Sequence, residues 1–277
     1  MGVFDGVLFT TDMDGTLLRG SDSSISEENV RAAEYFMSEG GRFCFATGRL
    51  PSELGEYNSR IHTNAPCICA NGALLCDLDT GECSLLSEIG EDIIPFIEKI
   101  HRNYPGIILE IDSCREVQHI RTLPVLEKQR EISSVPFKKI NAIGEAEHPW
   151  VKIAFWGEEK EVEGLVASLP RRDIPRGCVV IKTYKYCAEL IMTERGKEAG
   201  LIECRKRLPD IRIAAAVGDH GNDIEMLKCA DIGFAVGNAI DGAKKAADVI
   251  LSRDCNHSAV AEAIETLEKM LRGEKSR

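Results

Sequence analysis

Two aspartates separated by one residue follow an apolar segment near the N-terminus. The run Val7–Thr11 has the character of a buried strand, and Asp12-Met13-Asp14-Gly15 comes directly after it. Strand ends in α/β sheets open onto the crevice where ligands bind, and a glycine there lets the backbone turn closely around a ligand. Because Asp-x-Asp-Gly also occurs in calcium loops and in ordinary turns, this segment by itself leaves a functional and a structural interpretation open.

The residues around the two aspartates argue against a calcium loop of the EF-hand type. Such a loop needs further oxygen ligands downstream, a glutamate at its twelfth position and flanking helices. Here an apolar strand precedes the aspartates, and Ser21-Asp22-Ser23-Ser24-Ile25 follows them. The EF-hand interpretation therefore fails.

A second apolar run, far along the chain, also ends in carboxylates. Ile213–Val217 leads into Gly218-Asp219-His220-Gly221-Asn222-Asp223. If the two strands are neighbours in a parallel sheet, the four aspartates of the two segments converge. Clustered carboxylates repel one another unless a hard cation with a preference for oxygen neutralises them. This pattern predicts magnesium as the cofactor.

Two further polar segments follow strand-like runs. Thr47-Gly48-Arg49 comes after Arg42–Ala46, and Lys197 lies near the start of a predicted helix, after the apolar run Ala188–Met192. A Thr-Gly pair alone most often marks a plain turn, and the N-terminal end of a helix disfavours a cation. A bound anion would explain a lysine at this position.

Together these segments resemble, in the same order, the four motifs of the haloacid dehalogenase-like hydrolases, most of which are magnesium-dependent phosphatases. Two more segments resemble the Cof-type branch, whose cap domain lies between the second and third motifs. The resemblance implies a phosphatase that hydrolyses a small phosphorylated metabolite, such as a sugar phosphate or phosphoglycolate. The four motifs correspond to Asp12–Leu18, Ala46–Arg49, Lys197 and Gly218–Asp223, and the Cof-type segments to Ala70–Ala73 and Ala235–Ala239.

The same resemblance implies a role for each residue. Asp12 would attack phosphorus and form an aspartyl-phosphate, while Asp14 would protonate the leaving oxygen and then activate water. Lys197 would offset the charge of the phosphate and of the surplus carboxylates. For Arg49 the alternative is a surface or structural ion pair. The implied magnesium ligands are Asp12, Asp14 through its main-chain carbonyl, Asp219 and Asp223, and the implied substrate-binding residues are Thr47, Gly48, Arg49, Lys197 and Asn222.

Composition limits the remaining function classes. The chain has 277 residues, a net charge of -11 and 44% hydrophobic residues, as in an ordinary globular protein. The acidic balance argues against non-specific binding of nucleic acid, and no apolar run is long enough to span a bilayer. No secretory signal is evident. We therefore expect a cytoplasmic enzyme, a monomer or homodimer, that acts on a small metabolite and has neither nucleic acid nor a membrane as its partner.

The sequence contains 11 cysteines, some of which are closely spaced. Cys67, Cys69, Cys76 and Cys83 could suggest a zinc site, but they lack the tight Cys-x-x-Cys knuckle, and no second pair follows. In a reducing compartment we expect reduced, mostly buried thiols.

The distribution of strands and helices predicts the architecture. Residues 1–82 and 191–277 alternate strand and helix, which predicts a doubly wound, Rossmann-like parallel sheet. Between them, residues 83–190 are interrupted by prolines from Pro95 to Pro175, and they predict an inserted α+β cap domain. The expected helices span about 26–38, 52–61, 92–103, 197–208, 223–229 and 258–271, and the expected cap strands about 107–111, 151–155 and 179–186.

The substrate is not readable from the core motifs, because the cap must recognise the leaving group. Charged cap residues mostly form solvated faces, but five could face the site: Arg115, His119, Arg121, Lys182 and Lys185. Two other functions use the same motifs. A phosphomutase-type transferase would keep the phosphoryl group from water, and a non-catalytic binding protein would have no need of all the charged residues.

Overall fold

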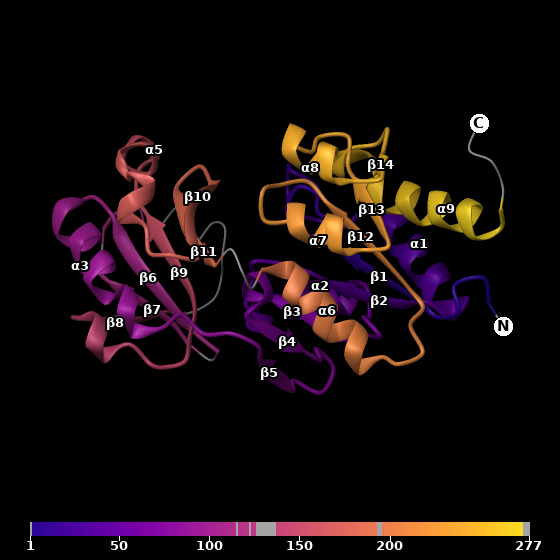
Figure 1. The fold of residues 1–277 in the computed structure, drawn as a ribbon, viewed down its shortest axis with the longest axis horizontal. Coiled ribbons are helices and arrows are strands. Elements are labelled where there is room, and N and C mark those ends of the chain that lie inside the picture. Colours follow the sequence, from indigo (N-terminus) through magenta and orange to yellow (C-terminus); the bar gives the residue numbers. More distant parts are fainter. Residues whose placement is uncertain (1, 115, 122, 126–136, 193–195, 274–277) are drawn as a thin grey trace. The chain divides into compact units, whose positions relative to one another are not determined.

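The computed structural model describes residues 2–114, 116–121, 123–125, 137–192 and 196–273 (Figure 1). These residues form two compact units. A core unit comprises the residues up to Leu86 and from Gly196 onward, and a cap unit begins at Ser87 and comprises the segment between. The boundaries expected from the sequence, after residues 82 and 190, lie a few residues before these positions.

The core unit is built on a five-stranded parallel sheet with the order β14-β13-β12-β1-β2. Neighbouring strands β1 and β12 run in register, with Thr11 opposite Val217. The chain continues from β1 to one side of the sheet and later returns to the other, so β1 and β12 flank the topological switch point where such sheets bind ligands. The strands span Val7–Thr11 (β1), Arg42–Phe45 (β2), Ile213–Gly218 (β12), Ile232–Ala235 (β13) and Val249–Ile250 (β14).

Helices pack around this sheet in two groups. Helix α1 has Ser26 as its N-cap residue, and the hydroxyl of Ser26 accepts a hydrogen bond from the main-chain amide of Asn29. It packs beside α9, while α6 packs beside α7 and α7 beside α8. The helices span Glu27–Ser38 (α1), Gly55–Arg60 (α2), Lys197–Arg207 (α6), Ile224–Cys229 (α7), Asp241–Ala246 (α8) and Ala259–Leu271 (α9).

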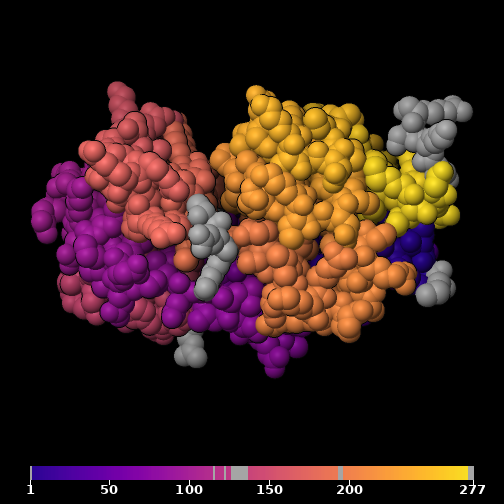
Figure 2. Space-filling model, in the orientation of Figure 1, coloured from indigo at the N-terminus to yellow at the C-terminus, as the bar shows by residue number. Residues whose placement is uncertain are grey.

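Strand β1 lies in the middle of the core. All five of its residues are buried, and the ring of Phe9 stacks on that of Phe43 with centroids 5.7 Å apart. On the face of the core unit shown in Figure 2, little of the indigo N-terminal segment is visible. A strand enclosed on both faces gives a rigid base to the loop that follows it.

A small antiparallel sheet, β3-β4-β5, extends the core unit. It contains Cys67–Cys69 (β3), Leu74–Cys76 (β4) and Cys83–Leu85 (β5), and Cys76 lies opposite Cys83. These two cysteines form a disulfide, so the expectation of reduced thiols is wrong for this pair. The reason is the hairpin register, which places the two residues directly opposite each other on adjacent strands. The other nine cysteines take no part in this disulfide, and most of them are buried, as expected.

The cap unit contains a six-stranded sheet with the order β10-β11-β9-β6-β7-β8. Helices α3 and α5 cover one face and enclose a hydrophobic core that includes Ile97, Leu165, Ile111 and Phe155. The sequence predicted α3 and most of the strands but not β7, β8 or α5. The elements span Ile94–Asn103 (α3), Ile108–Ser113 (β6), Val117–Ile120 (β7), Phe137–Ile140 (β8), Trp150–Trp156 (β9), Glu159–Ser168 (α5), Cys178–Tyr184 (β10) and Cys187–Met192 (β11).

Charged side chains are also buried in the cap sheet. Nε2 of His119 lies 2.7 Å from Oε2 of Glu110, and both residues are buried. Nζ of Lys152 lies 3.8 Å from Oε1 of Glu110 and 3.4 Å from Oε1 of Glu189. These carboxylates come from strands β6 and β11, so the ion pairs connect adjacent strands of the sheet.

All four described cap residues that were considered as substrate contacts have partners within the cap, and His119 with its partner Glu110 is one of them. Arg121 donates hydrogen bonds to the main-chain carbonyls of His101, Tyr104 and Ile107. Lys182 and Lys185 both lie within ion-pair distance of Glu159. Arg115, the remaining basic candidate, lies outside the described residues.

Over the part of the chain that the structure describes, no helix combines the length and the apolar character needed to cross a membrane.

Candidate active site

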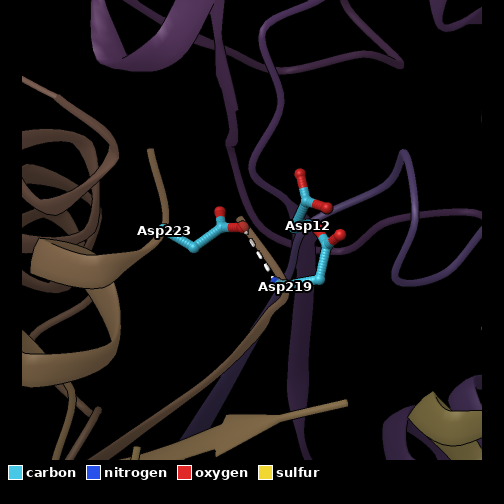
Figure 3. A group of neighbouring side chains, drawn as sticks. All are labelled: Asp12, Asp219 and Asp223. Atoms are coloured by element: carbon cyan, nitrogen blue, oxygen red, sulfur yellow. Dashed lines mark hydrogen bonds between the residues drawn. The ribbon is translucent and has the colours of Figure 1, made fainter. Parts of the chain in front are cut away.

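Three aspartates converge at the carboxyl ends of β1 and β12 (Figure 3). Asp12 follows β1, Asp219 follows β12, and Asp223 directly precedes α7. One carboxylate oxygen from each residue lies within 4.8 Å of the corresponding oxygens of the other two. The main-chain amide of Asp12 donates to the carbonyl of Val217 over 2.9 Å, so the strand pairing itself places Asp12 beside the end of β12.

Lys197 is fully buried in contact with this group. It is the first residue of α6, and its Nζ lies 2.6 Å from Oδ1 of Asp12 and 2.7 Å from Oδ1 of Asp223. Burial works against the charged ammonium, but the negative charges of Asp12 and Asp223 outweigh it and hold the pKa of Lys197 above its usual range. The lysine is therefore a buried cation between two carboxylates.

The carboxylates remain in excess over this one lysine. Burial, followed by the charge of Asp223, raises the pKa of Asp12 well above its ordinary value. The same two causes raise the pKa of Asp219 to about 7. Lys197 lowers both pKa values, yet not enough to cancel burial and mutual repulsion. This part of the core has a surplus of negative charge that a cation would relieve.

The donor atoms fit a hard divalent cation. Oδ2 of Asp12 is buried and accepts no hydrogen bond from any described residue. The carboxylate of Asp223 is held in place, because its Oδ2 accepts hydrogen bonds from the main-chain amides of Asp219 and His220. Both donor–acceptor distances are 3.0 Å. Carboxylate oxygens are the ligands that magnesium prefers. The structure thus brings together the carboxylates of three predicted metal ligands, Asp12, Asp219 and Asp223. The fourth predicted ligand is the main-chain carbonyl of Asp14.

The loop after β1 passes closely over Asp219. Gly15 has φ of +83°, and a Cβ atom there would lie 2.6 Å from Oδ2 of Asp219. The hydroxyl of Thr16 donates to Oδ1 of Asp219 over 3.2 Å, and Nδ2 of Asn238 donates to the carbonyl of Gly15 over 2.8 Å. No role for Thr16 or Asn238 was predicted from the sequence. Asn238 lies in one of the two Cof-type segments, and this position was the only feature of the sequence that pointed to a role for it.

Asp14 points to a different partner. Nε and Nη2 of Arg49 donate to its two carboxylate oxygens over 2.9 and 2.6 Å. The guanidinium of Arg49 also lies over the ring of Tyr57, 5.1 Å from its centroid. Such a two-pronged contact fixes both the distance and the plane of the carboxylate. The ion pair considered for Arg49 is therefore present, and its contact with the substrate stays a prediction.

The remaining predicted substrate residues surround Asn71. Thr47 is buried, and its hydroxyl accepts a hydrogen bond from the main-chain amide of Arg49 over 3.1 Å. A Cβ atom at Gly48 would lie 3.1 Å from the side-chain amide of Asn71. Nδ2 of Asn222 donates to Oδ1 of Asn71 over 3.0 Å. The structure therefore connects the second motif to the fourth through a residue that had no assigned role.

These features define an enzyme site of a particular class. Carboxylates at a topological switch point, together with a buried lysine, are suited to binding a cation and an anionic group next to a carboxylate nucleophile. Comparison with known proteins agrees, because residues 9–264 match the haloacid dehalogenase-like hydrolases. The chain therefore belongs to the haloacid dehalogenase-like hydrolase family, as its motifs predicted.

Relatives and solved structures cover nearly the whole chain. Phosphatase YwpJ of Bacillus subtilis (strain 168) is 26% identical over 275 residues, which cover 90% of this chain and 96% of that protein. The phosphoglycolate phosphatase of Methanopyrus kandleri is 25% identical over 263 residues, which cover 94% and 96%. A crystal structure of a haloacid dehalogenase-like hydrolase from Bacteroides thetaiotaomicron matches with a TM-score of 0.79 at 23% identity, covering 94% of this chain and 98% of that one. The predicted α/β fold and the prediction of an enzyme of the haloacid dehalogenase-like phosphatase class are confirmed.

Proposed function

We propose that this protein is a magnesium-dependent phosphatase that hydrolyses a small phosphorylated metabolite through an aspartyl-phosphate on Asp12. The observation that carries the proposal is the state of the Asp12 carboxylate. One of its oxygens is held by Lys197, while the other is buried and accepts no hydrogen bond from any described residue. Such a carboxylate is fixed in orientation and is suited to act both as a nucleophile and as a metal ligand.

Asp12 attacks phosphorus, and the bond between phosphorus and the leaving oxygen breaks. The leaving oxygen takes a proton from Asp14, and Asp14 then removes a proton from the water that attacks the aspartyl-phosphate. Inorganic phosphate leaves, and Asp12 is restored. Lys197 and the hydroxyl of Thr47 hold the phosphoryl oxygens, and Asn222 orients them. In this scheme Arg49 holds Asp14 as an ionised carboxylate, and Asp14 leaves this ion pair when it carries the proton for the leaving oxygen.

Asp12, Asp219 and Asp223, with the main-chain carbonyl of Asp14, would hold the magnesium. The ion supplies charge neutralisation for the phosphoryl group as negative charge develops on its oxygens. Two observations support this assignment: one carboxylate oxygen from each aspartate lies within 4.8 Å of the others, and Oδ2 of Asp12 is buried.

We propose sugar phosphates and small organic phosphates such as phosphoglycolate as the substrate classes. A relative of comparable length is named a phosphoglycolate phosphatase, which supports the second class. In this proposal the cap unit recognises the leaving group, while the core binds only the phosphoryl group. A cytoplasmic location and a monomeric or homodimeric state stay predictions, and fractionation and gel filtration test them.

The test is phosphate release from a panel of phosphorylated metabolites, measured with magnesium and with chelator. We expect release that depends on magnesium, needs no bisphosphate activator and stops with chelator. Calcium should inhibit, because its larger ligand number and looser geometry disturb in-line attack. Full activity in chelator would contradict the proposed dependence on magnesium. Phosphoryl transfer to a second metabolite in place of phosphate release would favour the phosphomutase alternative.

A further inference from the structure

The loop between β3 and β4 lies against three of the four motifs. We propose that this loop, Ala70-Asn71-Gly72, is a positioning element of the phosphoryl site, in which Asn71 holds Asn222 in place and Gly72 sets where α6 begins. The inference rests on the proposed function, because it assigns the loop to the site where the phosphoryl group would bind.

The loop has an unusual backbone. Ala70, Asn71 and Gly72 have φ values of +48°, +53° and +98°. Only glycine adopts this region freely, and a non-glycine residue persists there when surrounding contacts impose it. Asparagine tolerates it better than most residues do, because its polar side chain can form local hydrogen bonds, whereas the methyl group of alanine cannot. Two consecutive non-glycine residues in this region therefore indicate that external contacts determine the loop.

Those contacts come from the second motif. The main-chain amide of Asn71 donates to the carbonyl of Thr47 over 2.9 Å, and that of Ala70 donates to the carbonyl of Arg49, also over 2.9 Å. The amide of Thr47 in turn donates to the carbonyl of Ile68 over 2.8 Å. The loop and the second motif therefore fix each other, which couples the backbone of Ala70 and Asn71 to the placement of the Thr47 hydroxyl.

The side chain of Asn71 reaches the fourth motif. It is 9% exposed, and its Oδ1 accepts the hydrogen bond from Nδ2 of Asn222. Asn222 lies between Asp219 and Asp223, so a contact at this position acts on the segment that connects the two carboxylates. Asn71 does not need to contact the substrate for this role.

Gly72 contacts the third motif. A Cβ atom on Gly72 would lie 2.0 Å from the carbonyl oxygen of Gly196 and 3.0 Å from the main-chain nitrogen of Lys197. Gly196 is the N-cap residue of α6, and Lys197 is its first residue. The close approach of the loop thus sets the position of the helix start that carries the buried lysine. Small displacements at this distance are expected to affect phosphoryl transfer, because the reaction needs accurate placement of its charged groups.

The first test replaces Asn71 by glycine, which keeps the positive φ accessible and removes the side chain. We expect Asn71→Gly to lower kcat/KM for an aryl phosphate about tenfold and to weaken inhibition by vanadate by a similar factor, about 1.4 kcal/mol in each case. The matched control is Asn58→Ala. Asn58 is also buried and hydrogen-bonds to Thr63 and Asp79, away from the site. The Asn58→Ala substitution should lower Tm and leave kcat/KM and the affinity for vanadate unchanged.

A double-mutant cycle with Asn222→Ala tests whether Asn71 acts through Asn222. If it does, Asn71→Gly in the Asn222→Ala background should cost much less than the tenfold seen alone. Two outcomes would overturn the inference: losses that multiply in the double variant, or an Asn71→Gly protein that loses stability as Asn58→Ala does while its kcat/KM and vanadate affinity stay at wild-type values.

Gly72→Ala tests the second part of the loop. Its Cβ would displace the start of α6, so we expect weaker binding of inorganic phosphate, measured by calorimetry in magnesium. Unchanged phosphate affinity in a folded Gly72→Ala protein would show that the loop does not determine the position of Lys197. This binding experiment keeps the two proposals separable, because wild-type protein that binds phosphate but releases none from any substrate would contradict the proposed function alone.

Discussion

At the scale of single residues, the site depends on the unequal surroundings of the two oxygens of Asp12. Oδ1 is 2.6 Å from the ammonium of Lys197, while Oδ2 is buried and accepts no hydrogen bond from the described residues. Burying a carboxylate oxygen in this way costs free energy unless a ligand compensates. The arrangement is therefore expected at a site that binds a cation and reacts, and it is not expected of a residue that only stabilises the fold.

The first prediction concerns Asp12 itself. Asp12→Asn is nearly isosteric but removes the attacking charge, so kcat should fall more than about a hundredfold, roughly 2.7 kcal/mol in barrier, while the circular dichroism spectrum stays unchanged. Asp22→Asn is the control, because Asp22 is exposed and hydrogen-bonds to Ser24. Activity of Asp12→Asn within about tenfold of wild type would remove Asp12 from the role of nucleophile.

The second prediction concerns the pKa of Asp219, which is about 7 in the folded protein and 3.8 ordinarily. Because the folded-state pKa is raised, the stabilising contribution is fully present below about pH 4 and is lost as the pH rises through 7. In chelator, the Tm of the wild type should fall relative to that of Asp219→Asn between pH 5 and 8. Each kcal/mol corresponds to roughly 2–4 °C in a protein of this size.

Magnesium should reverse that loss of stability. At pH 8 the ion should raise the Tm of the wild type by binding the folded state, and it should do so much less for Asp219→Asn. Thermal unfolding followed by circular dichroism measures both effects. An equal response of the two proteins to magnesium would place the ion away from Asp219.

At the scale of elements, the order of the strands brings the motifs together. β1, β2 and β12 are adjacent, so the residues after their carboxyl ends become neighbours although Asp12 and Asp219 are far apart in the chain. Helix α6 adds Lys197 at its first residue. The N-terminal end of a helix disfavours a cation, and here two carboxylates compensate for this.

The third prediction concerns the hairpin of β4 and β5. The disulfide between Cys76 and Cys83 closes a loop with a sequence separation of 7, and the loop-entropy model assigns such a cross-link roughly 2 kcal/mol. Cys83→Ser should therefore lower the free energy of unfolding by about that amount, and reductant should lower it for the wild type but not for the variant. Cys229→Ser is the control, since Cys229 is free and exposed. A wild type whose denaturant midpoint is the same with and without reductant would speak against the cross-link.

At the scale of the whole molecule, our proposal gives recognition of the leaving group to the cap unit and phosphoryl transfer to the core unit. The cap unit has its own sheet and its own hydrophobic core, and the predicted catalytic residues all lie in the core unit. A specificity element of this kind can change its side chains without disturbing the carboxylates at the strand ends.

The fourth prediction follows from this separation. Replacing residues 87–195 by a short Gly/Ser linker should leave a folded core that binds magnesium and slowly hydrolyses small aryl phosphates. Its preference among phosphorylated metabolites should collapse, because the residues that contact the leaving group are gone. Substrate ranking over the metabolite panel measures this. If the truncated protein kept the ranking of the full chain, specificity would lie in the core, and the loop around Asn71 would be the best candidate.

The sequence by itself determined the parallel core and its acidic strand ends. Ile213–Val217 is a continuous apolar run and Val7–Phe9 is another, followed by two threonines, which is the composition that burial on both faces of a sheet favours. Asp12 and Asp219 come at or near the ends of these runs. A local pattern of this kind is readable because the side chains and the strand that positions them are adjacent in the chain. The same locality explains why α1 and α9 were predicted within a residue or two of their observed ends.

Only the tertiary structure decided which distant residues meet. β7 and β8 have four residues each, too few for a periodic pattern, and their pairing comes from the rest of the cap sheet. The disulfide depends on hairpin register, and the contacts of Thr16 with Asp219 and of Asn71 with Asn222 join segments far apart in sequence. Hydrogen bonds between distant segments leave no periodicity in the chain, because they depend on the order and register of strands that pack together only after folding.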